Sequence, residues 1–350
     1  MGRSLIVGSH TIDDGSDCFV IAEVGHNHQG ELEKAKELFR RAKECGVDAV
    51  KLQKRDNRSL YTAALYNKPY DHENSFGLTY GEHREFLEFG VEEYRELKRY
   101  AEEVGLALLA TAFDFPSADF LRELDIPAYK IASGDLKNIP LIRHVAGFQR
   151  PVLISTGGGT LEDVERVHDA VAPINPRLCF LQCTASYPTP PEEMSLRVVT
   201  TLRERFPDVV IGLSDHYNGI AMAVAAYVLG ARVIEKHFTL NHTWKGTDHA
   251  LSLEPIGMQK MVRDLRRARV ALGDGTKRIY PSEAPAIRKM GKSLVAAAPL
   301  PAGHRLRRED IAVKSPGGGV PPFELDRMLG KVLRRAVDED EPLAFELLSN

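Results

Sequence analysis

The sequence predicts a (β/α)8 barrel, a TIM barrel, followed by a small separate C-terminal domain. From residue 18 to about residue 272, short apolar runs alternate with amphipathic helical segments. Continuous apolar strands of this kind are typical of a parallel sheet that is buried on both faces. After Gly273 the alternation stops and the units become shorter, with tight Pro and Gly turns. A chain of 350 residues fits one large barrel and a small partner domain.

Eight short apolar runs are the candidate strands of the barrel. They span residues 18–23, 49–53, 107–111, 128–132, 152–155, 179–182, 209–214 and 233–236. Amphipathic segments between them include residues 32–45, 91–104, 161–171, 196–206, 220–229 and 256–272. Eight strand–helix units over roughly 250 residues match the size of a closed barrel. An open doubly wound sheet is the alternative, but the turn AEVGHNHQG after the first strand is not the Gly-rich phosphate turn that such sheets usually carry.

Three further segments complete the expected organisation. Residues 5–7 and 11–12 flank Gly8-Ser9, which predicts a hairpin that closes one end of the barrel. The connection 54–90 is unusually long and polar, so we expect a functional lid or a partner contact there. The predicted domains are a barrel with its hairpin at 1–273, a linker without strong periodicity at 274–291, and a small domain at 292–350.

Composition excludes several classes of function. The net charge is −3 and the pI is about 6.5, which argues against a surface for nucleic acid or for acidic membranes. No apolar run approaches the roughly 20 residues that span a bilayer, and the N-terminus lacks the apolar core of a signal peptide. We therefore expect a cytoplasmic protein. The four cysteines match no zinc or redox spacing, so they are expected to be reduced, buried thiols.

Polar side chains occur at the C-terminal end of every candidate strand, which is where barrel enzymes carry their active sites. In chain order they are Glu23, Lys51, Gln53, Thr111, Lys130, Ser133, Ser155, Tyr187, Ser214, Asp215, His216, Glu235, Lys236 and His237. Any one of them could be an ordinary loop or capping residue. Their recurrence after eight apolar strands predicts a polar pocket.

Two lysines lie within or beside apolar strands, Lys51 in AVKLQ and Lys130 in AYKIAS. A buried lysine needs a compensating anion. Hydroxyl groups are expected at neighbouring strand ends, from Thr111, Ser133, Ser155 and Ser214. Together these groups favour a site for a small, highly anionic ligand such as a phosphate compound. The alternative use of such a lysine is a Schiff base.

Histidines end the last two candidate strands, which are neighbours in a closed barrel. His216 and His237, with carboxylates nearby, suit a divalent metal with open coordination positions, although each could be a hydrogen-bond partner only. His26 and His28 form a second pair, His-Asn-His, similar to the metal-binding pair of barrel hydrolases. This pair begins three residues beyond its strand, so we favour a backbone-organising or substrate-facing role for it.

Several motifs in one order resemble a known family. They are IAEVGHNHQG, DAVKLQ, YKIASGDLKNIPLI, ISTGGGTLEDV, CTASYPTPPEEMSL, GLSDHYNG, GARVIEKHFTL and GTDHALSLEP. They resemble the successive motifs of the sialic acid synthase family, which includes N-acetylneuraminate and spore-coat polysaccharide synthases. The segments SLVAA, IAVKSPGGG and MLGKVLRRAV resemble the antifreeze-like (SAF) domain that follows the barrel in that family.

The resemblance implies a reaction. Phosphoenolpyruvate would condense with an N-acylated sugar aldehyde, N-acetylmannosamine or a related amino sugar, to give a nonulosonic acid with release of phosphate. His216 and His237 match the ligands of a manganese or magnesium ion, and these two histidines with Glu23, Lys51 and Lys130 match catalytic positions. The resemblance also implies a homodimer in which the tail domain lies over the partner's barrel.

Substrate positions follow from the same resemblance. Positions that hold phosphoenolpyruvate are matched by Lys51, Thr111, Lys130, Ser133, Ser155 and Ser214. Positions around the acceptor sugar and the reacting centre are matched by Glu23, Gln53, Tyr187, Glu235 and Asp248.

Two departures concern the acceptor sugar. Family members that use N-acetylmannosamine commonly carry Asn where this chain has Ala185, and Arg in the tail where it has Ser315. A hydroxyl does not replace a bidentate guanidinium, so the sequence leaves the acceptor open. The competing functions are a Schiff-base aldolase of the pyruvate type, a metal-dependent barrel hydrolase that uses His26 and His28, and a non-catalytic carbohydrate-binding protein.

Overall fold

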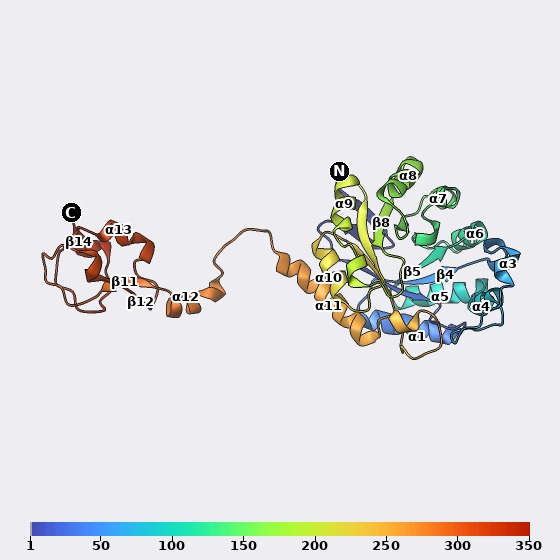
Figure 1. Ribbon diagram of the computed structural model, residues 1–350, viewed down its shortest axis with the longest axis horizontal. Helices are drawn as coiled ribbons and strands as arrows, with labels where there is room; N and C mark the ends of the chain where they lie inside the picture. Colours follow the sequence, from blue (N-terminus) through green and yellow to red (C-terminus); the bar gives the residue numbers. More distant parts are fainter. Residues whose placement is uncertain (1) are drawn as a thin grey trace. The chain divides into compact units, whose positions relative to one another are not determined.

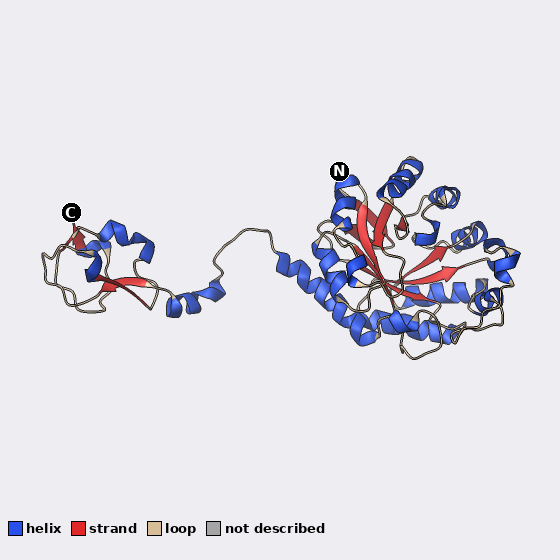
Figure 2. Ribbon diagram, in the orientation of Figure 1, coloured by secondary structure: helices blue, strands red, loops and turns tan. Residues whose placement is uncertain are grey.

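The computed structural model describes residues 2–350. The chain divides into two compact units, of which the first ends at Gly273 and the second comprises Asp274–Asn350. In the first unit, central strands are surrounded by helices (Figure 1 and Figure 2). The second unit is small and contains short strands and helical turns (Figure 2).

Eight parallel strands form a closed barrel, which confirms the predicted fold and excludes the open sheet. Their order around the barrel is β10-β3-β4-β5-β6-β7-β8-β9. Their bounds are β3 (Phe19–Gly25), β4 (Ala49–Lys54), β5 (Ala107–Ala112), β6 (Tyr129–Ile131), β7 (Val152–Ser155), β8 (Leu178–Cys183), β9 (Val210–Asp215) and β10 (Val233–His237). Each predicted strand overlaps one of these elements, because a strand buried on both faces leaves a continuous apolar run.

Helices follow the strands on the outside of the barrel. They are α1 (Leu32–Cys45), α5 (Val91–Glu103), α6 (Phe115–Glu123), α7 (Ile139–Ala146), α8 (Leu161–Val171), α9 (Val198–Arg205), α10 (Ala221–Val228) and α11 (Pro255–Leu272). The six amphipathic segments named from the sequence are all helical. The two short helices α6 and α7 start at the side-chain caps Asp114 and Asn138, each followed by a proline in the first turn.

The hairpin of β1 (Ser4–Val7) and β2 (His10–Asp13) closes one end of the barrel, as predicted. Its side chains Leu5, Val7 and Ile12 belong to one buried apolar cluster with Phe19 and Ala49 at the N-terminal ends of the strands. The barrel interior is therefore apolar at this end.

The long connection after β4 folds into three short helices, α2 (Asn57–Leu60), α3 (Ala63–Tyr66) and α4 (Tyr80–Phe86). Each begins at a side chain that accepts a hydrogen bond from a backbone N–H of its first turn, and these side chains belong to Asp56, Thr62 and Thr79. Such caps stabilise short helices that have little apolar surface to bury. The segment is an ordered structure beside the C-terminal ends of the strands.

The second unit begins with the segment that the sequence analysis assigns to a linker. Residues 274–291 were predicted to be a linker without strong periodicity, yet they contain the helices η4 (Pro281–Glu283) and α12 (Ala284–Met290). A carboxylate of Glu283 accepts a hydrogen bond from the backbone of Tyr280, which starts this helical segment. Its periodicity is weak because the segment contributes no buried side chain.

The remainder of the second unit has its own apolar core. Two antiparallel pairs organise it, β11 with β12 and β13 with β14. Its elements are β11 (Ser293–Ala296), η5 (Arg308–Asp310), β12 (Ile311–Lys314), η6 (Pro322–Glu324), α13 (Leu325–Met328), β13 (Val332–Leu333), η7 (Phe345–Leu347) and β14 (Leu348–Ser349). The side chains of Leu294, Leu306, Ile311, Met328 and Leu343 lie in one buried cluster.

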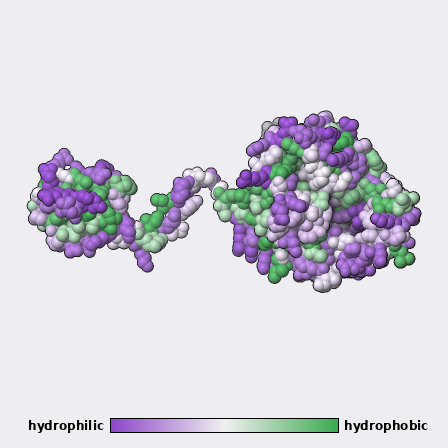
Figure 3. All heavy atoms as spheres, in the orientation of Figure 1, coloured by the Kyte–Doolittle hydropathy of each residue, from purple (hydrophilic) through white to green (hydrophobic). Residues whose placement is uncertain are grey.

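Apolar residues on the visible face of the barrel unit are scattered among hydrophilic ones (Figure 3). Between residues 2 and 350, none of the helices combines the length and the apolar character needed to span a bilayer.

The close approach of β9 and β10 at Gly212 leads to a prediction about stability. A Cβ at this position in β9 would lie 2.4 Å from the backbone oxygen of Val233 and 2.5 Å from Leu181. Overpacking of this kind costs about 1–3 kcal/mol. Gly212→Ala should therefore lower the free energy of unfolding by about that amount, measured by guanidinium denaturation with the fluorescence of Trp244, the single tryptophan.

Gly134→Ala is the matched control, because a Cβ there meets nothing within 4 Å. Equal stability of the two variants would contradict the predicted crowding between β9 and β10.

Candidate active site

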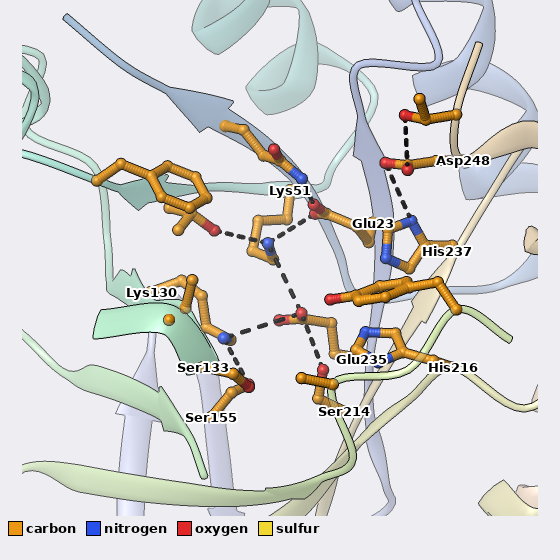
Figure 4. Close-up of a pocket in the computed structure, with 18 of the residues that line it drawn as sticks. Glu23, Lys51, Lys130, Ser133, Ser155, Ser214, His216, Glu235, His237 and Asp248 are labelled. Atoms are coloured by element: carbon orange, nitrogen blue, oxygen red, sulfur yellow. Dashed lines mark hydrogen bonds and ion pairs between the residues drawn. The ribbon is translucent and has the colours of Figure 1, made fainter. Parts of the chain in front are cut away.

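All thirteen catalytic and substrate-binding residues proposed from the sequence line one cavity of about 520 Å³ at the C-terminal end of the barrel (Figure 4). They are Glu23, Lys51, Gln53, Thr111, Lys130, Ser133, Ser155, Tyr187, Ser214, His216, Glu235, His237 and Asp248. Ligand cavities usually measure about 300–1,000 Å³. In Figure 4 the two lysines lie on one side, the two histidines on the other, and the two glutamates between them.

The strand register brings these side chains together from distant parts of the chain. Lys51 of β4 is the register partner of Glu23 in β3. Thr111 of β5 pairs with Lys130 of β6. Ser214 of β9 pairs with Glu235 of β10. The pocket is therefore built on strands rather than on loops.

Lys51 is the centre of the charge network. Its ammonium lies 2.7 Å from Glu23 Oε2 and 3.7 Å from Glu235 Oε1, and it donates to Thr111 Oγ1 at 2.8 Å. Burial alone lowers the pKa of Lys51, but Glu23 and Glu235 outweigh it and the net shift is upward. Burial raises the pKa of Glu23 to about 7 despite the nearby ammonium. Lys51 is thus held as a cation, while Glu23 is poised between its two protonation states.

The positive charge of Lys130 is less closely compensated by carboxylates than that of Lys51. Its ammonium donates to Ser155 Oγ at 2.6 Å and to the backbone oxygen of Ile131 at 2.8 Å, and it lies 4.0 Å from Glu235 Oε1. Burial lowers the pKa of Lys130. Burial raises the pKa of Glu235, but Lys130 and Lys51 outweigh it, so the net shift is downward. The protein itself therefore supplies counter-charges to both lysines, where the sequence predicted that a ligand would do so.

Hydroxyl groups surround the lysine end of the pocket. Ser133 Oγ accepts a hydrogen bond from the backbone of Gly157 at 3.1 Å. Ser214 Oγ lies 3.4 Å from Glu235 Oε1, while the other oxygen of Glu235 is buried and has no partner within residues 2–350. This end of the pocket offers two ammonium groups and four hydroxyls, and all of these side chains are buried except Ser133, which is half-buried.

The two histidines lie side by side, with ring centroids 5.4 Å apart. His216 Nδ1 contacts the backbone oxygen of Thr184 at 3.0 Å, so this nitrogen carries the proton and Nε2 keeps a free lone pair. His237 Nδ1 is buried, has no hydrogen-bond partner in the described part of the chain, and lies 3.8 Å from Asp248 Oδ2. Burial lowers the pKa of both histidines, that of His216 to about 4, so both imidazoles are neutral at pH 7.

These two rings fit a divalent metal, which binds the neutral form of histidine. Within residues 2–350, no group of three His, Cys, Asp or Glu side chains could hold a metal ion by itself. A metal on His216 and His237 would therefore have coordination positions open to substrate oxygens or water.

A buried ion pair lies behind the histidines. Lys236 donates to Asp215 Oδ2 at 2.9 Å and to the backbone oxygen of Tyr217, and neither charged side chain has any exposed area. Asp215 also accepts a hydrogen bond from the backbone of Tyr217 at 2.8 Å. Because Asp215 precedes His216 and Lys236 precedes His237, the pair fixes β9 against β10 where the histidines emerge.

Three of the five residues predicted for the acceptor sugar and the reacting centre, Gln53, Tyr187 and Asp248, lie closer to solvent, whereas Glu23 and Glu235 are buried. Gln53 Nε2 donates to Glu23 Oε1 at 2.7 Å. The ring of Tyr187 covers His216 with centroids 4.1 Å apart, and Tyr187 is 54% exposed. Asp248 is 23% exposed. The pocket thus has a buried charged end and a more open rim.

Sequence reasoning missed two arginines at this rim, Arg55 and Arg84, which also line the cavity. Arg55 follows Lys51 and Gln53 at two-residue spacing, which was a usable signal, since alternate residues point to one side of a strand. Arg84 comes from α4, and nothing in its local sequence marks it.

The pair His26 and His28 does not line the cavity. His28 Nδ1 accepts a hydrogen bond from the backbone of Gly30, and its ring stacks on Phe89 with centroids 4.1 Å apart. His26 lies between the guanidinium groups of Arg55 and Arg84. These contacts agree with a backbone-organising role and do not suit a metal ion, because two cations already face His26.

Comparison with known proteins decides the family. A model described as the NeuB family matches residues 38–277, more than half of the chain. The chain belongs to the NeuB family. In this NeuB-family protein, a SAF domain model matches residues 291–349, within the second unit.

Relatives agree with this assignment. The N-acetylneuraminate-9-phosphate synthase of Homo sapiens is 44% identical over 334 residues, which cover 95% of this chain and 93% of the relative. The N,N'-diacetyllegionaminic acid synthase of Legionella pneumophila is 34% identical, with 94% of each chain covered. A solved structure of N-acetylneuraminic acid synthetase from Leptospira borgpetersenii, in complex with citrate, matches with a TM-score of 0.71 and 29% identity, covering 82% of this chain and 96% of that one.

The NeuB-family protein is therefore an enzyme, a synthase of nonulosonic acids. The predicted family, fold class and enzyme class are confirmed.

The buried ion pair of Asp215 and Lys236 leads to a prediction about stability. Asp215→Asn leaves the ammonium of Lys236 buried without a counter-charge, and breaking a buried pair in this way costs about 3–5 kcal/mol. The double variant Asp215→Asn/Lys236→Met should recover most of that loss, because it buries no uncompensated charge. Denaturation followed by Trp244 fluorescence measures both variants.

Glu92→Gln, which removes an exposed ion pair to Arg95, is the control and should leave stability unchanged. If the double variant were no more stable than Asp215→Asn alone, the pair would not be the source of the loss.

Proposed function

We propose that the enzyme condenses phosphoenolpyruvate with an open-chain N-acylated hexosamine to a nonulosonic acid, with release of phosphate. One observation carries this proposal. The buried end of the pocket presents the two ammonium groups of Lys51 and Lys130 among hydroxyls, and such a site suits a small ligand with several negative charges.

Phosphoenolpyruvate fits that buried end. Its phosphate and carboxylate would take hydrogen bonds from Lys51 and Lys130. Further hydroxyl donors stand at the neighbouring strand ends, namely Thr111, Ser133, Ser155 and Ser214. Because these groups are fixed on strands, they orient the ligand before the second substrate arrives.

His216 and His237 would hold a manganese or magnesium ion beside the acceptor. Bound there, the ion would supply Lewis-acid polarisation of the aldehyde oxygen. The orphaned Nδ1 of His237 and the hydrogen bond that fixes His216 support this assignment. Asp248 and Tyr187 lie against the two histidines, where they would orient the sugar.

The bond changes define what the protein must stabilise. Carbon 3 of phosphoenolpyruvate bonds to the aldehyde carbon, and the aldehyde oxygen takes up a proton. Positive charge develops at carbon 2, where water adds and loses a proton. The hydroxyl on carbon 2 then gives up its proton as the C–O bond to phosphate breaks, which leaves a ketone and inorganic phosphate that carries the proton away.

Glu23 is our candidate for the proton transfers. It lies in hydrogen-bond contact with Gln53 and Lys51, and its pKa of about 7 lets it accept or donate a proton at neutral pH. Positioned acid–base groups typically contribute about 10²–10⁴ in rate. Glu235 lies between the two lysines, and one of its buried oxygens has no partner among the described residues, so it would face the developing positive charge.

A Schiff-base aldolase is the second candidate, because burial lowers the pKa of Lys130 and so favours a nucleophilic amine. Two hydrogen bonds already hold the Lys130 ammonium, and Lys51 is kept protonated by two carboxylates. These contacts support ion binding by both lysines.

Phosphate release tests the proposal. Purified enzyme should release inorganic phosphate from phosphoenolpyruvate only when an N-acylated hexosamine and Mn²⁺ or Mg²⁺ are both present. His237→Ala should lose this activity and also bind Mn²⁺ more weakly, measured by electron paramagnetic resonance. His168→Ala is the control, because His168 lies on the outer helix α8.

Turnover that persists in the presence of chelator, with a lysine adduct trapped by borohydride, would refute the condensation and establish the aldolase.

We also propose that the active form is a homodimer in which the second unit covers the partner's barrel. The second unit exposes large apolar side chains, including Ile279 at 77%, Met290 at 66% and Phe323 at 82%. Exposed apolar groups of this size favour a contact surface.

Light scattering should therefore give a dimer mass at micromolar concentration. Phe323→Asp should shift the mass towards the monomer and reduce activity, because the acceptor rim would be uncovered. Val270→Asp, a change at another exposed apolar residue (82%), on helix α11 of the barrel unit, is the control. A fully active monomer would contradict this arrangement.

A further inference from the structure

Arg55 and Arg84 form a cationic cluster that the condensation, as described so far, does not use. Arg55 is 7% exposed and follows β4, whereas Arg84 belongs to α4, yet both line the same cavity. Arg55 packs its guanidinium 3.8 Å from the centre of the Phe113 ring, and Arg84 lies 5.1 Å from the centre of the Tyr80 ring. Aromatic faces hold both cations at the rim.

The two arginines are short of acceptors. Arg55 Nη1 lies 3.1 Å from His26 Nε2, and Arg84 Nη1 lies 3.3 Å from His26 Nδ1. Burial lowers the pKa of His26 well below its ordinary value, so the ring is neutral and has a single acceptor nitrogen. One of the two guanidinium groups therefore faces an N–H rather than a lone pair.

Other acceptors around the cluster are few. Arg55 Nη2 donates to Gln53 Oε1 at 2.7 Å, and Arg84 Nε donates to the hydroxyl of Tyr80 at 3.1 Å. These are neutral groups, and each guanidinium carries five N–H donors.

The nearby carboxylates do not neutralise the cluster. Glu88 lies 4.0 Å from Arg55, but it is also the partner of Lys54, whose ammonium is 3.0 Å away. Asp248, at the edge of the same cavity, faces His237 at 3.8 Å. The rim therefore keeps net positive charge and unused donors that face the cavity.

We propose that Arg55 and Arg84 bind the phosphate of a phosphorylated acceptor, an N-acylated hexosamine that carries phosphate on carbon 6. The proposal rests on the proposed condensation and specifies its second substrate. Arginine suits a phosphate because its planar group donates two parallel hydrogen bonds.

The layout of the pocket agrees with this substrate. Lys51, Gln53 and Arg55 succeed one another at two-residue steps, so their backbones advance about 6.6 Å per step from the buried end towards the rim. Hydrogen bonds link Arg55 through Gln53 to Glu23, which contacts Lys51. An open-chain hexosamine has its aldehyde and its carbon 6 at opposite ends. An aldehyde beside the histidines and phosphoenolpyruvate thus leaves carbon 6 free to extend to the rim.

The position of the phosphate in the product agrees with a phosphate site at the rim. Phosphoenolpyruvate adds three carbons at the aldehyde carbon, so carbon 6 of the acceptor becomes carbon 9 of the product. A phosphate at carbon 9 is the one named in the product of the human relative.

Steady-state kinetics with three acceptors test the proposal in the full-length enzyme with Mn²⁺. The acceptors are N-acetylmannosamine, its 6-phosphate and a 6-deoxy di-N-acetyl hexosamine. We expect kcat/KM to be highest for the 6-phosphate, by at least about tenfold. Arg84→Gln should remove this preference by raising KM for the phosphorylated sugar, while KM for phosphoenolpyruvate and kcat/KM for N-acetylmannosamine stay unchanged.

Two further variants separate charge from structure. Arg84→Lys keeps a cation and should retain part of the preference. Arg95→Gln removes an exposed arginine on α5 and should retain all of it.

Some outcomes would overturn the subsite. One is a wild-type enzyme with equal kcat/KM for N-acetylmannosamine and its 6-phosphate, and another is a higher kcat/KM for the 6-deoxy sugar. A third is an Arg84→Gln variant in which kcat/KM falls equally for N-acetylmannosamine and its 6-phosphate, which is the result expected if Arg84 bound the acyl group.

A failure of the proposed condensation would give a different result from a failure of the phosphate subsite. No phosphate release with any of the three sugars would refute the proposed function. In that case, calorimetric binding of N-acetylmannosamine 6-phosphate still decides the subsite, because wild type must bind it more tightly than Arg84→Gln does.

Discussion

The alternation of two lysines with two glutamates inside the barrel is the constraint on which the rest of the site depends. Each buried ion costs several kcal/mol unless opposite charge lies close to it. Lys51 lies between Glu23 and Glu235, and Glu235 also faces Lys130, so no charge in the row is isolated. The apolar packing at the other end of the barrel fixes the strands and hence this spacing. An incoming anion must compete with the carboxylates, and Glu23, with its pKa of about 7, can give up its charge at little cost.

Much of this arrangement follows from the sequence, because parallel barrel strands are both apolar and directional. An apolar run shows where a strand lies, and the rule that active sites occupy the C-terminal strand ends then selects residues such as Lys130 and His237. The pairing of Lys51 with Glu23 could not be derived in this way, because it depends on the register between strands. For that reason the sequence assigned the compensation of Lys51 to a ligand instead of to a neighbouring glutamate.

Residues outside the strands were harder to predict for a different physical reason. Arg84 reaches the pocket because short capped helices fold the connection after β4 back over the barrel end. Side-chain caps at Thr62 and Thr79 determine that path, and caps leave no hydrophobic period in the sequence. The helix α12 escaped prediction for the same reason, since it buries no side chain of its own.

The acceptor side of the pocket is where this chain departs from family members that use N-acetylmannosamine. Ala185 lines the cavity but offers no hydrogen bond. Ser315 bonds within its own unit, to Lys292 at 2.6 Å and to the backbone of Met290 at 3.4 Å. In the proposed subsite, Arg55 and Arg84 provide cationic recognition of the sugar's phosphate from the barrel unit. Arg55 directly follows β4, the strand that carries Lys51, so the proposed anchors for the two substrates lie four residues apart on one stretch of the chain.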